Sequence, residues 1–453
     1  MTIWYNIIKR FAAPSLPKPT ETYDQRYFDA LVNVLRLYFN QLDDLLGRIV
    51  AVTASTVPVS IGGVNVDAFG RIRSSAPYTL FDSQNRYAKN DLFSESTTGS
   101  ATVTYDANAS TVQLNVTAAS GDEVVRQTLR SFSYQPGKGL LVMNTFVMPT
   151  ANANQRIRIG YFNTENGVFL ERASSTVYFT RRTSVTGAPV DTQVAQANWN
   201  GDKLDGTGAS GYTLDLTKAQ IFWEDFEWLG VGSVRCGFVI NGETIICHTF
   251  QNANNLTSVY MTTAILPVRY EITNTGASTA ATLKQICSTV ISEGGYEKKV
   301  ATDVVRMTAV NTNITTASFT PLISIRLAPG RTGAVIVPDG YSVLPTATSS
   351  VTFEVLMIKN ATLTGPTAWN ATSSSNVQAD IASTGCSGGT IIHSNYVLAS
   401  NLSSNLVSNG TDYNWDLQLG ATLAGVSDTY TVAIRALTGT HSAIGTMAFW
   451  DLT

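Results

Sequence analysis

The stretch that decides the fold is VRCGFVINGETIICHTF, residues 234–250. In it, Asn-Gly stands between two apolar runs, and this dipeptide in such a setting is the strongest short-range signal of a two-residue β-hairpin turn. The stretch therefore predicts two antiparallel strands joined by a tight turn.

The turn also fixes the expected pairing of two cysteines. A two-residue loop places Ile240 opposite Glu243, and counting outward places Cys236 opposite Cys247. That position is a hydrogen-bonded site, where Cα atoms lie ~5.5 Å apart and the geometry suits a disulfide poorly. We therefore predict two buried, reduced thiols.

Short alternating runs extend the β pattern on both sides of this hairpin. TVQLNV (111–116) and RIRIGYF (156–162) alternate apolar and polar residues, and TVYFT, AQIFWEDFEW and PVRYEI continue the series to about residue 292. Half-buried strands at this density, separated by turn residues, are typical of a two-sheet sandwich. We predict a mainly β chain with a jelly-roll β-sandwich of the concanavalin or laminin-G kind at residues 78–292.

A second set of strands is expected after residue 292. EGGYEKKVATD (293–303) combines a glycine pair with a charge cluster and indicates a boundary. LISIRL, GAVIVP, VTFEVLMI and YTVAIRAL then resume the β pattern. Residues 293–453 are enough for another β-sandwich domain, and no fixed-period repeat argues for a β-helix.

One helical run precedes all these strands, YFDALVNVLRLYFNQLDDLLGRI at residues 27–49. Thr22 to Gln25 fits a capping box, and Gly47 is expected to fray the last turn. Apolar residues recur at gaps of three and four, which is the seam of a heptad repeat. We predict a heptad helix over residues 22–49 that serves oligomerisation. The predicted seam consists of Phe28, Leu31, Leu35, Tyr38, Leu42, Leu45 and Ile49.

The segments that flank this helix differ in character. Residues 1–21 begin with an apolar stretch that precedes its basic pair, the reverse of a secretory signal. We interpret them as a docking segment, with a disordered leader as the alternative. Residues 50–77 are rich in small residues and are expected to form an extended connector. The docking side chains would be Trp4, Tyr5, Ile7, Ile8 and Phe11.

Composition excludes several classes of function. Charged residues make up 14 % of the 453 residues, and the formal net charge is −3. An average soluble protein has about 25 % charged residues, and nucleic-acid binding needs clustered Lys and Arg, so we expect no nucleic-acid partner. No run approaches the ~20 apolar residues of a membrane span. The four cysteines and three histidines lack metal-ligand spacing, so neither a metal nor a cofactor is expected.

WEDFEW (223–228) is the one cluster that suggests catalysis. Glycosidases with a jelly-roll fold place an acid and a nucleophile on one strand face, ~5–5.5 Å apart in retaining enzymes. Here strand alternation puts Glu224 on one face with Phe226 and Trp228 and leaves two carboxylates, Asp225 and Glu227, on the other. An ordinary strand with buried tryptophans explains the pattern equally, so we predict no catalytic residues and no enzymatic activity.

Several longer segments carry a resemblance to a known group of proteins. They are AFGRIRSSAPYTLFDSQNRY (68–87), GDEVVRQTLRSFSYQPGKGLLV (121–142), the hairpin region from residue 222, and LQLGATLAGVSDTYTVAIRAL near the end of the chain. Together with the helical module they resemble virion structural proteins of tailed bacteriophages, particularly those of aquatic and cyanobacterial hosts.

The resemblance implies a location in the virion and an arrangement for the helix. Phage fibres are commonly homotrimers attached by an N-terminal segment, so the helix would bundle with two sister copies while residues 1–21 dock on another virion protein. The β-domains would then be displayed, with host-surface attachment as a possible role. The alternatives are a head-decoration, tail or neck protein without receptor function, and a glycan-binding or glycan-cleaving tailspike. A helix packed on its own β-domain would exclude the bundle.

Overall fold

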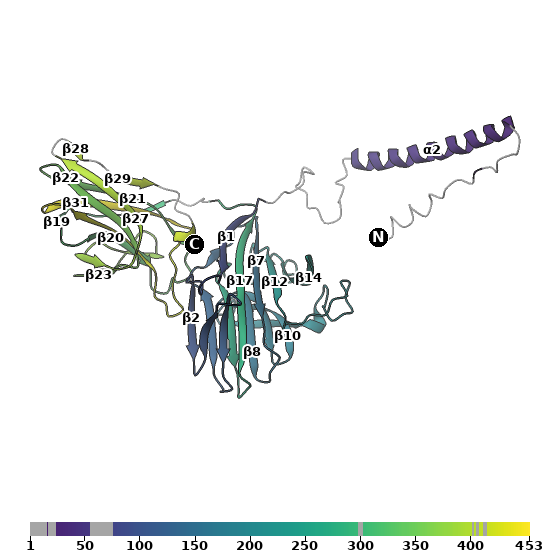
Figure 1. The fold of residues 1–453 in the computed structure, drawn as a ribbon, viewed down its shortest axis with the longest axis horizontal. Coiled ribbons are helices and arrows are strands. Elements are labelled where there is room, and N and C mark those ends of the chain that lie inside the picture. The colour runs from purple at the N-terminus through teal and green to yellow at the C-terminus, as the bar shows by residue number, and fades with distance from the viewer. Residues whose placement is uncertain are drawn as a thin grey trace. The chain divides into compact units, whose positions relative to one another are not determined.

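The computed structural model describes residues 16, 24–54, 76–297, 302–400, 403–404, 407–410 and 415–453. The chain divides into two compact units, Met1–Ser75 and Ala76–Thr453. In the described part of the first unit there is one helix, α2, and all the strands belong to the second unit (Figure 1). The prediction of a mainly β chain preceded by one helix is confirmed.

Helix α2 spans Gln25–Ala54. Oδ1 of Asp24 accepts a hydrogen bond from the backbone N–H of Arg26 at 2.9 Å, so Asp24 caps the first turn. The helix therefore begins later than the capping box at Thr22 predicts.

The C-terminal end of α2 also differs from the prediction. The helix continues past Gly47 to Ala54, so the extended connector expected from residue 50 is wrong over residues 50–54. One glycine inside a helix costs only about 1 kcal/mol, and no proline follows before Pro58. This cost is small compared with the stabilisation that the other residues of a 30-residue helix contribute.

Two antiparallel sheets face each other in the first half of the second unit, in a jelly-roll-like arrangement (Figure 1). The eight-stranded sheet has the order β14-β13-β12-β7-β17-β4-β3, with β1 also paired to β17. Its strands are β14 (Glu243–Phe250), β13 (Val234–Ile240), β12 (Gln220–Phe226), β7 (Gly139–Val147), β17 (Ala281–Glu293), β4 (Thr111–Val116), β3 (Thr102–Asp106) and β1 (Tyr78–Gln84).

The seven-stranded partner sheet has the order β11-β10-β9-β8-β16-β5-β2. Its strands are β11 (Val190–Ala195), β10 (Thr176–Thr183), β9 (Gly167–Ala173), β8 (Gln155–Phe162), β16 (Val268–Asn274), β5 (Glu123–Thr128) and β2 (Phe93–Thr98). A short ladder joins β6 (Phe132–Ser133) to β15 (Ile265–Leu266), and the 3₁₀ helix η1 spans Gln196–Asn198. Alternation explains the core, because the apolar members of each strand point into the space between the sheets.

The remaining strands form a second set of antiparallel sheets with its own apolar core. The five-stranded sheet consists of β18 (Thr302–Arg306), β31 (His441–Asp451), β21 (Ile336–Thr346), β29 (Val407–Gly410) and β19 (Asn311–Ile314). The seven-stranded sheet consists of β24 (Asn370–Ala371), β25 (Val377–Asp380), β20 (Thr320–Leu327), β30 (Thr429–Ala436), β22 (Val351–Lys359), β27 (Thr390–Ser400) and β28 (Ser403–Ser404). The ladder of β23 (Thr362–Thr364) with β26 (Gly385–Ser387) and the 3₁₀ helix η2 (Trp415–Leu417) complete this part.

The two sets of sheets share core residues. Val335, Val337 and Leu452 belong to the later set in sequence, but they are buried in the core of the first. Backbone N–H of Ala421 also donates to the carbonyl of Leu129 at 2.8 Å. The strands from β1 to β31 are therefore packed as one unit.

The hairpin of strands β13 and β14 forms where the sequence predicts it, with Ile240 opposite Glu243. A β-bulge at Gly237 shifts the register beyond that point, so Cys236 lies opposite His248, and the predicted pairing with Cys247 is wrong. Both thiols are buried and free, which confirms the prediction of reduced cysteines. Burial raises the pKa of the Cys247 thiol to about 12.

Candidate functional site

Strand β12 carries the cluster that suggested catalysis, and the structure places its central residue inside the sandwich. Glu224 is fully buried, and its Oε2 accepts a hydrogen bond from the backbone N–H of Tyr161 on the opposite sheet at 3.0 Å. Burial raises the pKa of Glu224 well above its usual range, although that hydrogen bond opposes the shift. A carboxyl group enclosed between two sheets cannot touch a substrate.

The other two acidic residues of the cluster are separated. Asp225 lies on the outer face of the sheet, where Nε of Arg235 donates to its Oδ2 at 2.9 Å. Glu227 lies beyond the end of β12 and accepts hydrogen bonds from Ser233 at the following turn. The expected pair of Asp225 and Glu227 on one strand face is therefore not formed.

A different carboxyl group does approach Asp225. A Cβ added to Gly139 would lie 3.0 Å from Oε2 of Glu293 and 3.5 Å from Oδ1 of Asp225, so the two acids flank this glycine. Burial raises the pKa of Glu293, Asp225 raises it further, and Arg235 opposes the shift. Sequence reasoning missed this pair, because Glu293 is 68 positions along the chain from Asp225 and only strand order brings β12 and β17 to either side of β7.

The outer face of the seven-stranded sheet holds a second group of carboxylates. Nε of Arg158 lies 3.4 Å from Glu171, and its Nη1 lies 3.5 Å from Glu271. Burial alone would raise the pKa of Glu271, but Arg269, Arg158 and Arg156 outweigh it and hold the pKa below its usual range. A carboxylate held ionised by three arginines is a poor general acid, so this network is structural.

Of the four predicted oligomerisation residues whose side chains are described on helix α2, two are exposed in the single chain and two are half-buried. Phe28 is 44 % exposed and Leu35 is 37 % exposed, while Leu31 and Tyr38 are half-buried. None of the side chains described on the helix, up to residue 40, is buried. The seam residues Leu42, Leu45 and Ile49 lie on the helix, but their side chains are outside the described part.

The predicted docking residues Trp4, Tyr5, Ile7, Ile8 and Phe11 lie outside the described residues. Within the described ranges, no helix combines the length and apolar character needed to cross a membrane. Across the same ranges, no three His, Cys, Asp or Glu side chains gather as a metal site would require.

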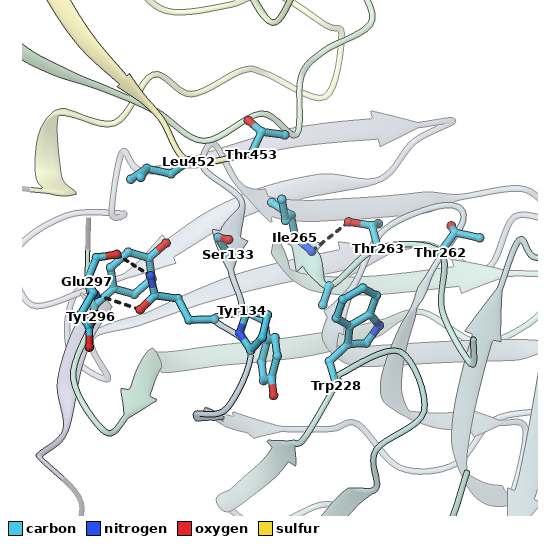
Figure 2. A pocket seen from close by; sticks show the side chains of 13 residues that line it. Ser133, Tyr134, Trp228, Thr262, Thr263, Ile265, Tyr296, Glu297, Leu452 and Thr453 are labelled. Atoms are coloured by element: carbon cyan, nitrogen blue, oxygen red, sulfur yellow. Dashed lines mark hydrogen bonds between the residues drawn. The ribbon is translucent and has the colours of Figure 1, made fainter. Parts of the chain in front are cut away.

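A pocket of about 320 Å³ opens beside the β6–β15 ladder, between it and the C-terminal end of the chain. Figure 2 shows Tyr134 and Trp228 on one side of it, Tyr296 and Glu297 on another, and Thr453 across from them. The rings of Tyr134 and Trp228 meet edge to face, with centroids 6.2 Å apart. Sequence reasoning did not find this pocket, because its walls come from five separate stretches of the chain.

Hydrogen bonds hold the pocket walls in place. Gln135 anchors Glu297 through both of its amide atoms, donating to the Glu297 carbonyl at 2.5 Å and accepting from its N–H at 2.9 Å. Thr263 Oγ1 accepts from the backbone N–H of Ile265 at 3.0 Å, as Figure 2 shows. These hydrogen bonds position Gln135, Glu297, Thr263 and Ile265 in the pocket wall.

Comparisons with known proteins show only weak similarities. No protein-family model matches the chain, and no curated protein matches its sequence. Among solved structures, a protein of unknown function from Shewanella oneidensis MR-1 matches at 12 % identity, over 55 % of this chain and 95 % of that one, with a TM-score of 0.32.

Two further structures have more informative names. A β-glucanase from Bacillus licheniformis matches at 10 % identity, over 48 % of this chain and 98 % of its own, with a TM-score of 0.31. The CBM2 module of the evolved Dit protein of Lactobacillus casei BL23 phage J-1 matches at 6 % identity, over 50 % of this chain and 100 % of its own, with a TM-score of 0.34. Similarities this weak do not bear on function, which has to be argued from this chain's own residues.

Proposed function

We propose that this protein is a non-enzymatic structural component of a bacteriophage virion, in which helix α2 joins sister copies and the β-sheets are displayed. The observation that carries the proposal is the exposure of two apolar side chains at predicted heptad-seam positions of α2. Apolar side chains at the seam positions Phe28 and Leu35 are exposed in the single chain, although burying such side chains is worth about 1.5–3 kcal/mol each. A long helix with an exposed apolar seam is stabilised when identical helices pack against it.

The rest of the molecule suits a displayed role. The strands form one packed unit with few charges, and the cluster that suggested catalysis is divided between the core, an ion pair and a turn. The resemblance of the sequence to phage virion proteins supplies the location, with a homotrimer as the favoured assembly and the N-terminal segment as the point of attachment.

The mass of the full-length chain in solution tests the assembly. Light scattering after size exclusion is expected to give a multiple of the chain mass of 48.7 kDa, with three copies favoured. A single species at the chain mass over micromolar concentrations would overturn the proposal.

One observation favours the rival function, cleavage of a glycan. Glu293, whose pKa is raised by burial, lies beside Asp225, which is paired with an arginine, and glycosidases combine a protonated acid with an ionised carboxylate. The two acids stand on the outer face of a sheet, and neither lines the pocket of Figure 2. The test is the release of reducing ends from a glycan. Release by the wild type and by Glu227→Ala, but not by Asp225→Ala or Glu293→Ala, would establish cleavage and overturn the non-enzymatic proposal.

A further inference from the structure

We infer that the pocket beside the β6–β15 ladder binds a neutral sugar ring, with Trp228 and Tyr134 as the aromatic platform. This goes beyond the structural role proposed above and does not require the helices to assemble. The pocket lies where segments from both sets of sheets meet, and ligand sites are common where such parts of a protein join.

The size of the pocket limits the class of ligand. A volume of about 320 Å³ is at the lower end of the range for small-molecule sites. It can hold a monosaccharide or a short glycan terminus, but a folded segment of another protein would not fit inside it. The ligand is therefore a small molecule or the end of a chain.

The charge of the described lining residues favours a neutral ligand over an anionic one. Among these residues, Glu297 is the one with an acidic side chain, and its Oε1 lies 3.8 Å from Nζ of Lys138. Within the described part of the chain, no lysine or arginine lines the pocket. A phosphate or a carboxylated sugar would find no cation among these residues to compensate its charge.

The chemistry of the walls matches a sugar ring. A pyranose has one apolar face of C–H groups and a rim of hydroxyls, so it needs an aromatic surface on one side and hydrogen-bonding groups around its edge. The pocket offers the rings of Trp228, Tyr134 and Tyr296 and, close to them, the hydroxyls of Ser133 and Thr263. The Thr263 oxygen already accepts from the Ile265 N–H, so its own hydrogen remains available to a ligand.

Two polar atoms at this site, Nε1 of Trp228 and the hydroxyl oxygen of Tyr134, have no hydrogen-bond partner among the described residues. Nε1 of Trp228 is buried and makes no hydrogen bond, and buried donors in native structures are normally paired with protein, water or ligand. A ligand hydroxyl that reaches Nε1 after a small shift of the indole would form a bond that the free protein lacks. Trp228 can therefore contribute both a stacking surface and a donor.

Saturation-transfer NMR on the full-length chain tests the inference. The probes are methyl glycosides of glucose, galactose and mannose, together with N-acetylglucosamine, and N-acetylneuraminic acid is the charged comparison. We expect transfer to at least one neutral sugar, strongest on the protons of its C–H face, and weaker transfer to the acidic sugar. If none of the neutral sugars receives saturation, or the acidic one binds best, the inference is wrong.

Variants locate the binding. Trp228→Ala is expected to weaken the affinity about tenfold, as loss of an aromatic contact should. Trp228→Phe keeps a ring but loses the donor, so its affinity for the sugar should lie between those of Trp228→Ala and the wild type. This variant provides the test if Trp228→Ala fails to fold. Tyr87→Ala, at a tyrosine that is 82 % exposed and outside the pocket, is the matched control. Affinity unchanged in both Trp228 variants would overturn the inference.

The assembly variant Leu31→Asp/Leu35→Asp separates this inference from the proposed function. A monomeric chain that still binds the sugar would leave the pocket assignment intact. A wild-type chain that proves monomeric but binds the sugar would overturn only the assembly. An oligomer that binds no sugar would overturn only the pocket.

Discussion

Glu224 is a carboxyl group enclosed between two sheets, and its protonation links folding to pH. Burial raises its pKa in the folded chain, whereas in the unfolded chain the group ionises at an ordinary value of about 4.3. Between the unfolded-state pKa and the raised folded-state pKa, the folded chain therefore binds more protons than the unfolded chain. The stability that comes from protonating this group is lost as the pH rises from the lower to the higher pKa.

We expect Glu224→Gln to stabilise the protein at pH 7 and to leave it nearly unchanged below about pH 4. The amide is neutral at every pH, so folding no longer requires a proton to be taken up. The wild-type carboxyl must instead take up a proton as it is buried. This costs about 1.4 kcal/mol for each pH unit by which the pH exceeds the pKa of the group in the unfolded chain. The amide oxygen can still accept from the Tyr161 N–H. Urea unfolding at both pH values measures the difference.

Glu243→Gln is the matched control, because Glu243 is exposed at the hairpin turn. Equal stability of Glu224→Gln and the wild type at both pH values would show that Glu224 is not protonated in the folded chain.

At the scale of the element, Gly237 determines the geometry of the β13–β14 hairpin. A Cβ there would lie 1.9 Å from the carbonyl oxygen of Ile245 and 2.9 Å from Cζ2 of Trp223. The absence of a side chain at Gly237 lets the Trp223 indole lie against β13. The neighbouring bulge places Cys236 opposite His248 instead of Cys247.

Gly237→Ala is expected to lower the free energy of unfolding by about 2 kcal/mol or more, because no flexible side-chain end can move away from the carbonyl contact. Chemical denaturation measures the loss. Gly333→Ala is the control, since its Cβ would meet only the Ser131 hydroxyl at 3.7 Å, and a change of about 0.5 kcal/mol or less is expected there. Similar losses at both glycines would contradict the packing argument.

Helix α2 provides the second prediction at this scale. Replacing Leu31 and Leu35 by aspartate places charges in the seam, and we expect the oligomer to dissociate because burying an unpaired charge is costly. Asn33→Asp, on the opposite side of the helix, should leave the mass unchanged. Analytical ultracentrifugation reports both. Dissociation by the Asn33 variant alone would assign the contact to the other face.

At the scale of the whole molecule, the strands from β1 to β31 should unfold together. Leu452 is buried in the first core although it follows the last strand, and the Gln418 side chain donates to the Ser131 carbonyl at 2.8 Å. Calorimetry is expected to show one main transition for residues 76–453. Two well-separated transitions would instead support independent domains divided near residue 293.

Leu452→Ala should lower the temperature of that single transition, since removing a buried leucine side chain costs about 2–5 kcal/mol. Val426→Ala is the control at a 64 % exposed site and should change it little. If Leu452→Ala left the transition unchanged, the shared core would not contribute to stability.

Local patterns in the sequence predicted several of the elements. TVQLNV is strand β4, RIRIGYF lies within β8, and the Asn-Gly turn forms with its predicted closing pair, because alternation and turn chemistry act over a few residues. The interpretation of WEDFEW as an ordinary strand rested on the same alternation, which sends Glu224 inward.

Only the tertiary structure determined which residues distant in sequence lie next to one another. The register shift between Cys236 and Gly237 places Cys236 opposite His248, and Asp225 lies near Glu293 because β7 lies between their strands. The pocket is formed by loops and the chain end, which have no common period. The physical reason is range: secondary structure follows from contacts between near neighbours in sequence, whereas sites depend on long-range pairing that packing of the whole core selects.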